Sequence, residues 1–332
     1  MNKPNSSLRP RESKSMPIKG SGANWMTHAV IVTRVAVELV SKASKWGWGM
    51  RGVLAFVVVA SMSAAAGNVA WAQECAGNPK ALGTSRVVEI DTTGGPGFGF
   101  EHFRQHDFLR RNEVVLTFDD GPWPTTAAVL KALADHCVKA TFFPIGKHAT
   151  YYPEILREVA KAGHTVGSHT WSHKNLGRMK DDEAKMEIEK GISAVEFALG
   201  APAAPFFRFP VLQHPPKQVT YLGERNVGIF STDLDSFDFK MRKPQQVIDS
   251  IMKKLEKNGK GIVLMHDFQK VTADAVAELL TKLKDGGYKI VHMTGKTPVK
   301  SLPEYDELVK KEIKLPTVSD RPTSSVVKTI SE

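Results

Sequence analysis

Short apolar runs alternate with amphipathic segments along the middle of this chain. Four apolar residues recur at the spacing of one helix face between residues 188 and 199, and Gly200 is suited to end that helix. A second helix of this kind is predicted over 244–255, with Pro244 in its first turn. Seven apolar runs of strand length lie around these helical patterns. They are residues 113–118, 140–143, 165–168, 206–209, 227–231, 261–265 and 289–292.

This alternation of strands and helices predicts a parallel sheet, either open or closed into a barrel. In α/β barrels the reacting groups collect at the C-terminal ends of the strands. Polar residues follow several of the predicted strands, or lie near their ends. They are Asp119 and Asp120, His169, Arg208, Asp235 and His266. We therefore expect side chains spread over nearly 150 positions to meet at one end of the sheet.

The adjacent pair Asp119 and Asp120 is the first candidate for chemistry. Neighbouring carboxylates repel, so a fold keeps them together when a cation or a shared proton compensates; an exposed acidic turn is the alternative. His169 and His173 are four residues apart, so one helical turn would bring both imidazoles to the same side. Two histidines and one carboxylate form a common zinc site with a position open for water. A His-x-x-x-His pair unrelated to metal is the alternative.

These segments together resemble the polysaccharide deacetylases that share the NodB-homology domain, a carbohydrate esterase family. Five motifs between about residues 113 and 292 carry the resemblance, in the order that the family has them. They are Thr117-Phe118-Asp119-Asp120-Gly121-Pro122, His169-Thr170-Trp171-Ser172-His173, Phe207-Arg208-Phe209-Pro210, Asp235-Ser236-Phe237-Asp238-Phe239 and Leu264-Met265-His266. Two positions depart from the family's pattern, because Val211 replaces a Tyr and Phe239 replaces a Trp. These departures bear on sugar specificity more than on the chemistry.

The resemblance implies a fold and a metal site. The fold is an irregular (β/α) barrel of about seven parallel strands, with the active site at the C-terminal strand ends. Asp120, His169 and His173 are the implied ligands of a divalent metal, with zinc first and other divalent transition metals as alternatives. Asp119 would be the base that takes a proton from water. Arg208 would orient Asp119, and a surface ion pair is the alternative for that arginine.

The remaining site residues also follow from the resemblance. The backbone N–H of Val211 would contribute to the oxyanion hole. His266 would be the general acid that protonates the departing amine, with a neutral core histidine as the alternative. The acid partner of His266 is either Asp235 or Asp238, and the sequence does not distinguish between them.

The charge of the chain is unevenly distributed. Its 332 residues carry a formal net charge of +10. Residues 1–72 hold 9 basic and 2 acidic residues, whereas residues 73–332 hold 36 and 33. The basic excess therefore belongs to the N-terminus, and no basic stripe or aromatic platform typical of nucleic-acid-binding proteins is evident. We expect no nucleic-acid partner.

Residues 1–72 are predicted to be an N-terminal extension with a signal peptide or a membrane anchor. Arg51 precedes an apolar run over 52–66, and Ala70-Trp71-Ala72 has the small-x-small pattern of a cleavage site. An uncleaved anchor is the alternative, because residues 52–72 are just long enough to span a bilayer. A membrane is an expected partner only in that case. Either form predicts export to the periplasm, the cell envelope or the medium.

The rest of the chain divides into three parts. Residues 73–112 are a Gly-rich lead-in expected to wrap the barrel or extend from it, and residues 113–297 are the deacetylase domain. Residues 298–332 are expected to form a flexible tail. Cys75 and Cys137 are the only cysteines, and in an exported protein they can pair. The sequence leaves that pairing open.

The resemblance implies a metal-dependent hydrolase that removes acetyl groups from the N-acetylated sugars of a polysaccharide or oligosaccharide. Peptidoglycan and chitin-type substrates are the leading candidates. An O-acetyl esterase acting on xylan or an exopolysaccharide is the nearest alternative, since one site handles both kinds of bond. An inactive carbohydrate-binding protein is a second alternative, against which the intact set of candidate residues argues.

Overall fold

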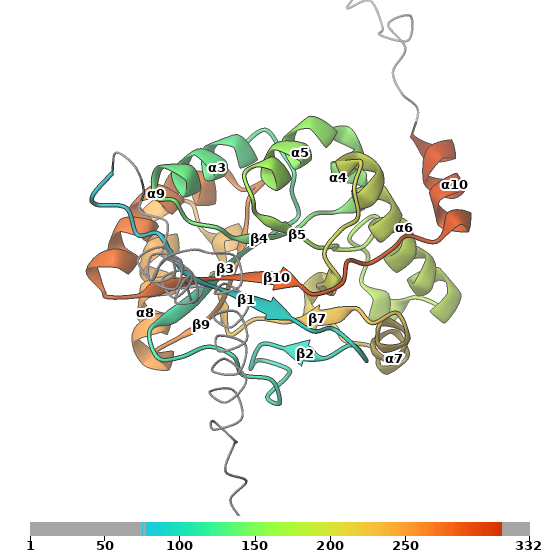
Figure 1. The fold of residues 1–332 in the computed structure, drawn as a ribbon, viewed down its shortest axis with the longest axis horizontal. Coiled ribbons are helices and arrows are strands. Elements are labelled where there is room, and N and C mark those ends of the chain that lie inside the picture. Colours follow the sequence, from blue (N-terminus) through green and yellow to red (C-terminus); the bar gives the residue numbers. More distant parts are fainter. Residues whose placement is uncertain (1–74, 76–77, 314–332) are drawn as a thin grey trace, which may run out of the picture. The chain divides into compact units, whose positions relative to one another are not determined.

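The computed structural model describes Cys75 and residues 78–313, which form strands β1–β10 and helices α3–α10 (Figure 1). The predicted signal or anchor segment and its cleavage site lie outside these residues. Within the part of the chain that the structure describes, no helix has the length and apolar character needed to cross a membrane.

The strand β3 (Glu113–Asp119) is the centre of the larger sheet, and every one of its residues is buried. It pairs in parallel with β9 (Gly261–His266) on one edge and with β4 (Thr141–Phe143) on the other. From there β4 continues to β5 (Thr165–Val166), and β9 continues to β8 (Leu234–Asp235). Strands that carry candidate residues are thus direct neighbours.

A smaller parallel sheet runs in the order β2 (Gly97–Phe98), β7 (Gly228–Phe230) and β6 (Phe206–Phe207). A parallel bridge between Ser168 and Phe207 joins the end of β5 to β6. The strands from β3 to β9 therefore follow one another around a common core. The expected α/β fold with an irregular barrel of parallel strands is confirmed.

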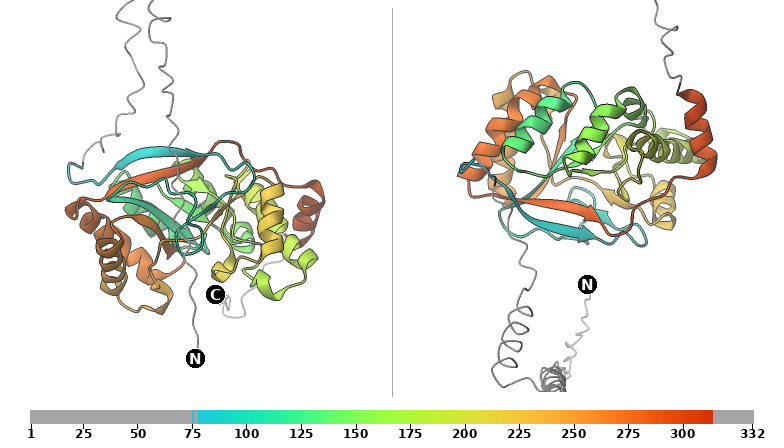
Figure 2. Two further views of the ribbon diagram at one scale, coloured as in Figure 1. Left: turned by 90° about the horizontal axis from the view of Figure 1, so that it is seen from below. Right: turned by 45° about the horizontal axis from the view of Figure 1, so that its top comes forward.

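The sheet begins earlier in the chain than the predicted domain boundary at residue 113. Strand β1 (Thr84–Ile90) pairs along most of its length with β10 (Lys289–Gly295), and Figure 2 shows the two side by side. The lead-in over 73–112 therefore supplies two strands, β1 and β2, so the boundary at 113 is wrong. Strand β1 escaped prediction because exposed and partly buried residues alternate along it, which leaves no continuous apolar run.

Helices connect most of the strands. They are α3 (Thr126–Asp135), α4 (Gly146–Tyr151), α5 (Pro153–Lys161), α6 (Asp181–Leu199), α7 (Pro216–Glu224), α8 (Pro244–Asn258), α9 (Lys270–Asp285) and α10 (Pro303–Glu312). The two helices predicted from periodicity are α6 and α8. Gly200 ends α6 with a positive φ of 69°, and Pro244 begins α8.

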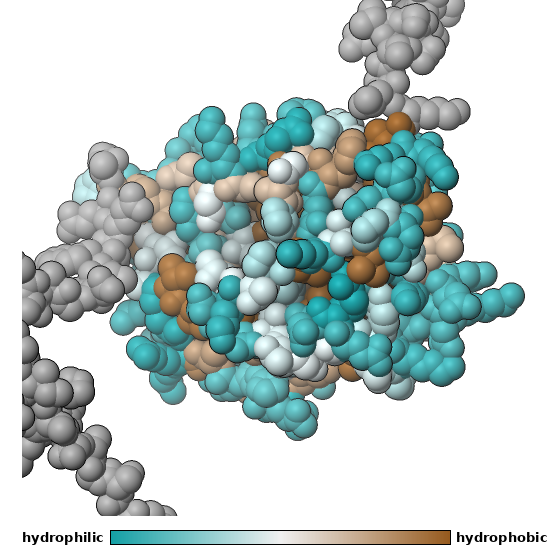
Figure 3. Space-filling model, turned by 45° about the vertical axis from the view of Figure 1, so that its right-hand side comes forward, coloured by the Kyte–Doolittle hydropathy of each residue, from teal (hydrophilic) through white to brown (hydrophobic). Residues whose placement is uncertain are grey.

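Helix α10 lies where the sequence predicted a flexible tail. It packs against α6, and its Val309 is fully buried beside Ala194 and Trp171. The expectation of a flexible tail is therefore wrong for residues 303–312, while residues 314–332 lie outside the described part. The face that carries α10 is mainly hydrophilic with small hydrophobic patches, as Figure 3 shows, and exposed apolar residues include Phe197 and Leu308.

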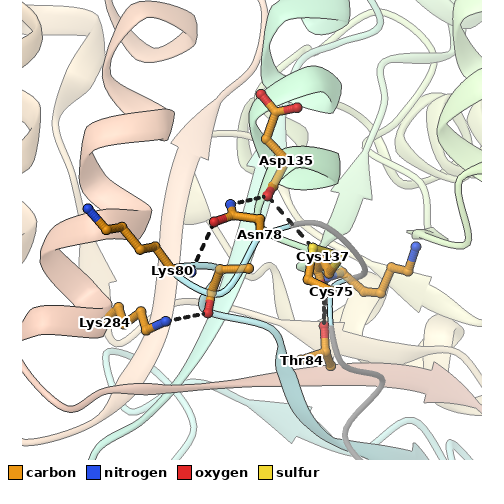
Figure 4. The surroundings of a disulfide bond; sticks show 9 residues. Cys75, Asn78, Lys80, Thr84, Asp135, Cys137 and Lys284 are labelled. Atoms are coloured by element: carbon orange, nitrogen blue, oxygen red, sulfur yellow. Dashed lines mark hydrogen bonds between the residues drawn. A yellow bond between two sulfur atoms is a disulfide. The ribbon is translucent and has the colours of Figure 1, made fainter.

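Cys75 and Cys137 form a disulfide, which resolves the question that the sequence left open (Figure 4). Their Cα atoms are 5.5 Å apart, and 62 positions separate them in the chain. Nearby, the Asn78 side chain donates a 2.8 Å hydrogen bond to the carbonyl of Asp135. The disulfide therefore ties the segment before β1 to the C-terminal end of α3.

Candidate active site

A cleft of about 520 Å³ opens where β3, β8 and β9 end. Seven of the predicted site residues line it. They are Asp119, Asp120, His169, His173, Val211, Asp235 and His266. The other two, Arg208 and Asp238, are fully buried and bonded to members of that set. A second cleft of about 490 Å³, beside the starts of β5 and β6, is lined by none of these residues.

Asp120, His169 and His173 form a compact group at the cleft. The Oδ1 atom of Asp120 lies 3.5 Å from Nε2 of His169 and 3.4 Å from Nε2 of His173. Ligands of tetrahedral zinc, bound at about 2.0–2.2 Å, lie about 3.3 Å from one another. This Oδ1 is also buried without a hydrogen-bond partner among the described residues. A buried carboxylate oxygen between two imidazole nitrogens fits a divalent cation.

The two histidines are presented by a loop, so the expectation of a helical turn is wrong. They follow β5, and both Thr170 and His173 adopt left-handed backbone conformations, with φ of 66° and 57°. The carbonyl of Arg208 lies 2.6 Å from Nδ1 of His169. Because a carbonyl only accepts, Nδ1 carries the proton and Nε2 keeps its lone pair for a ligand.

Helix α6 holds this loop in place. The carboxylate of Glu187 accepts 2.8 Å and 2.7 Å hydrogen bonds from the backbone and hydroxyl of Ser172. A Cβ on Gly191 would lie only 2.5 Å from the Thr170 carbonyl carbon, so this approach requires glycine. Sequence reasoning missed both residues, because nothing in the helical pattern distinguishes Glu187 from a surface charge.

Asp119 is paired with Arg208 inside the protein. The Nη1 atom of Arg208 donates 2.7 Å hydrogen bonds to Oδ1 of Asp119 and to the hydroxyl of Thr117. Nη2 donates to the carbonyl of Ser231, and Nε to that of Phe230. Burial raises the pKa of Asp119 to about 6, although the Arg208 charge opposes the change. Because Arg208 is fully buried, the surface ion pair is excluded.

His266 is paired with Asp238. Its Nδ1 lies 2.7 Å from Oδ1 of Asp238, and its backbone N–H donates 2.8 Å to the other carboxylate oxygen. Burial by itself would lower the pKa of His266, but the carboxylates of Asp238, Asp120 and Asp119 together outweigh burial and raise that pKa to about 9. Asp235 lines the cleft, and its Oδ1 accepts from the backbone of Phe237. Of the two candidate partners, the structure pairs Asp238 with His266.

Several backbone positions around the cleft are strained. Val211 has φ 50° and ψ 23°, which is an outlier for a β-branched side chain, and it is 59% exposed. Nine non-glycine residues have positive φ in the described part of the chain, and six belong to loops that form the cleft. These six are Asp120, Thr170, His173, Val211, Leu212 and Phe237. Such clustering is typical of functional sites.

Three further residues at the site carry no recognisable sequence signal. Asp267 is buried and accepts a hydrogen bond from the hydroxyl of Thr126, and burial raises its pKa to about 7. A Cβ on Gly121 would lie 2.1 Å from its carboxylate, so Asp267 supports the turn after Asp120. Glu101 and His102, between β2 and β3, line the cleft.

Comparisons of sequence agree with this geometry. Residues 108–226 match the family described as polysaccharide deacetylase. A peptidoglycan-N-acetylmuramic acid deacetylase of Bacillus subtilis is 34% identical over 192 residues, covering 56% of this chain and 39% of the relative. The chain thus spans well under half of that relative's length. A chitooligosaccharide deacetylase of Azorhizobium caulinodans is 30% identical, covering 47% of this chain and 74% of the relative.

A solved structure is similar to this chain in fold. The peptidoglycan deacetylase of Bdellovibrio bacteriovorus is similar with a TM-score of 0.60 at 32% identity, covering 67% of this chain and 61% of that one. Similarity in sequence and fold therefore extends over most of the described residues. With its motifs gathered at one cleft, this chain belongs to the polysaccharide deacetylase family.

Proposed function

We propose that this protein is a metal-dependent hydrolase that removes acetyl groups from N-acetylated sugars in a polysaccharide or oligosaccharide. The observation that carries the proposal is the buried Oδ1 of Asp120, which lies between the Nε2 atoms of His169 and His173 and has no hydrogen-bond partner in the part of the chain that the structure describes. The relatives act, by their names, on peptidoglycan and on chitooligosaccharides. Those glycans are the substrate classes we propose.

Asp120, His169 and His173 would hold the metal. One carboxylate and two imidazoles are ligands that zinc prefers, and other divalent transition metals are the alternatives. Neutral imidazoles and one carboxylate would leave a divalent ion with a net charge of about +1. A bound cation of this kind lowers the pKa of a water molecule and polarises the acetamide carbonyl.

Asp119 would be the base. Arg208 engages its Oδ1, which leaves Oδ2 to accept the proton of the attacking water. The buried guanidinium also makes hydrogen bonds to two backbone carbonyls, so the carboxylate is held against a fixed support. A positioned base of this kind contributes about 10²–10⁴-fold to a rate.

Val211 and His266 would act on the two ends of the breaking bond. The backbone N–H of Val211 would donate to the oxyanion that forms from the carbonyl, and Val211 lines the cleft in a left-handed backbone conformation. Asp238 engages Nδ1 of His266, which leaves Nε2 to protonate the departing amine. That Nε2 lies 3.9 Å from Oδ2 of Asp120, close to the proposed metal site.

We also propose that the protein is exported. A disulfide persists in oxidising compartments and is rare in the cytosol, and Cys75 and Cys137 are paired. The apolar run over 52–66 and the Ala-x-Ala pattern at 70–72 support a signal peptide or an anchor. N-terminal sequencing of the exported protein tests this: a start near Gln73 indicates cleavage, and active protein found only in the cytosol contradicts export.

The activity is tested with the purified protein, its metal content and a panel of acetylated glycans. We expect about one divalent ion per chain by mass spectrometry, since the site offers one set of ligands. Acetate should be released from chitooligosaccharides or from peptidoglycan fragments, and chelation should abolish the release. Acetate from acetylxylan alone would indicate an O-acetyl esterase. No release from any glycan by metal-loaded protein would indicate a binding protein.

A further inference from the structure

The segment 99–103 contributes two side chains to the cleft from outside the matched family region. It lies in the connection between β2 and β3, and it precedes residues 108–226, which match the family model. Glu101 and His102 line the cleft together with Asp119. Part of the cleft wall is therefore built by the lead-in that precedes β3.

The backbone of this segment is fixed against the loop after β7. The carboxylate of Asp233 accepts a hydrogen bond from the backbone N–H of Phe100, and that of Glu101 donates 3.1 Å to the carbonyl of Thr232. Gly99 has φ 96°, and a Cβ there would lie 2.7 Å from the backbone nitrogen of Thr232. Only glycine allows so close an approach, so the segment is a rigid part of the wall.

The side chain of His102 is held by a buried partner. Its Nδ1 lies 2.7 Å from Oγ of Ser231, and its ring centroid lies 4.4 Å from that of His214. Ser231 is fully buried, and its carbonyl accepts a 2.9 Å hydrogen bond from Nη2 of Arg208. His102 is therefore connected through Ser231 to the arginine that holds Asp119.

This arrangement leaves one polar atom of His102 for a ligand. Because Ser231 engages Nδ1, Nε2 is the nitrogen that can meet a molecule in the cleft. Nε2 accepts in one neutral tautomer and donates in the other, and a hydroxyl group can do both. A sugar hydroxyl can therefore form a hydrogen bond with Nε2 in either tautomer of His102.

The position of His102 indicates which sugar unit it would meet. Among the described residues, the side chain of His102 contacts Ser231 and His214, and none of its hydrogen bonds or ring contacts involves the proposed metal ligands or Asp119. We therefore assign His102 to a part of the cleft beside the proposed reaction centre. A cleft of about 520 Å³ falls in the range that holds drug-sized ligands, which corresponds to about two sugar units. Half-exposed Phe239 offers an apolar surface to such rings in the same cleft.

We propose that His102 is a specificity-determining residue that hydrogen-bonds a hydroxyl of the sugar unit next to the one that loses its acetyl group. The ligand class is a neutral oligosaccharide of N-acetylated hexosamines. This inference rests on the proposed function, because it assigns a neighbouring unit to the same reaction site.

Binding is measured first, in a background whose turnover is strongly reduced. In the Asp119→Asn protein, calorimetry with tetra-N-acetylchitotetraose should show that adding His102→Ala raises the Kd about 2–10-fold, which corresponds to one lost hydrogen bond. Ser231→Ala should also raise the Kd, because it removes the hydroxyl that holds His102. It keeps the backbone carbonyl that accepts a hydrogen bond from Arg208. His102→Gln, which retains a polar side chain, should recover part of the affinity.

A matched control comes from the same connection between β2 and β3. His106 contacts the ring of Phe98 at 5.6 Å and is not among the residues that line the cleft, so His106→Ala should leave the Kd unchanged. An unchanged Kd in His102→Ala, or an equal rise in His106→Ala, would overturn the proposal.

Turnover distinguishes a subsite from an indirect effect on Asp119. On otherwise unmodified protein, His102→Ala should lower kcat/KM for the tetrasaccharide by about 2–10-fold more than for an aryl acetate, which has no second sugar unit. Equal losses on both substrates would mean that His102 acts through Ser231 and Arg208, and would overturn the subsite. If the unmodified protein released no acetate from any glycan, the proposed function would fail, whereas the binding measurement would still report on His102.

Discussion

Arg208 and Asp119 form an ion pair from which solvent is excluded. Their closest atoms, Nη1 and Oδ1, are 2.7 Å apart, and the side chains are 0% and 3% exposed. Removing one partner of such a pair leaves an uncompensated buried charge, which typically costs about 3–5 kcal/mol. Loss of either side chain is therefore expected to destabilise the core and to disturb the orientation of the proposed base.

The first prediction separates the base from the metal ligands. Asp119→Asn should keep its metal and lose about 10²–10⁴-fold in acetate release, because an amide cannot take the water's proton. Its stability should fall by up to about 3–5 kcal/mol, since Arg208 loses its carboxylate. His169→Ala should instead lose most of the bound metal, measured by mass spectrometry. Normal turnover by metal-loaded Asp119→Asn would rule out this assignment.

The second prediction concerns His266 as an acid. An amide needs a proton on its departing amine, whereas an aryl acetate releases a phenolate without one. His266→Ala should therefore cost about 10²–10⁴-fold on an N-acetylated sugar and much less on an aryl acetate. Bound metal and Tm should stay near those of the unmodified protein. Equal losses on both substrates in a folded, metal-loaded variant would count against the acid role.

The third prediction concerns the loop that carries His169 and His173. Glu187→Gln removes the carboxylate that accepts two hydrogen bonds from Ser172, so the ligands should be less well positioned. Mutation of a residue that supports a metal ligand typically lowers the metal affinity by about 10–100-fold. Competition with a chelator measures the change. Glu183→Gln is the matched control, because Glu183 lies exposed on the same helix. The same affinity in both variants would show that Glu187 does not support the site.

The fourth prediction concerns the disulfide between Cys75 and Cys137. It closes a loop of about 62 residues, and the chain-entropy relation gives about 4 kcal/mol for a loop of this length. A reductant should lower the free energy of unfolding by roughly that amount in urea titrations. The double variant Cys75→Ser with Cys137→Ser should be equally destabilised and should not respond to reductant. A response in the double variant would show that reductant acts elsewhere.

The fifth prediction is a loss of stability in acid from two buried histidines. Burial lowers the pKa of His164 to about 3 and that of His292 to about 4, from an ordinary value near 6.5. The unfolded chain therefore takes up protons that the folded chain does not. Above pH 6.5 both histidines are neutral in either state and do not change the stability. Below pH 6.5 the free energy of unfolding falls by up to about 1.4 kcal/mol per pH unit for each histidine, until about pH 4 for His292 and about pH 3 for His164.

Chemical denaturation of the metal-free protein at pH 7 and pH 5 measures this loss. Nδ1 of His164 accepts a 3.1 Å hydrogen bond from the backbone of Ala140, and the side-chain oxygen of an asparagine can take its place. His164→Asn should therefore reduce the pH dependence of the free energy of unfolding. An identical dependence in both proteins would contradict the assignment to His164.

Secondary structure was predictable where one strand or helix is buried along its length. Strand β3 is buried at every residue, so its apolar run is visible in the sequence, and the same holds for β9 up to His266. Strand β1 alternates between exposed and partly buried residues, and its partner β10 lies about 200 positions later in the chain. A local pattern carries no information about such a distant pairing, so β1 was missed.

The sequence by itself determined which residues are available for chemistry, because motifs that follow buried strands identify Asp119, Asp120, His169 and His266. Only the tertiary structure decided which side chains meet. The turn at Phe237, with φ 57°, separates Asp235 from Asp238, and the latter points to the end of β9. His102, Glu187 and the two cysteines likewise owe their contacts to segments distant in sequence. Such contacts arise from packing around a shared core, which residue spacing along the chain does not encode.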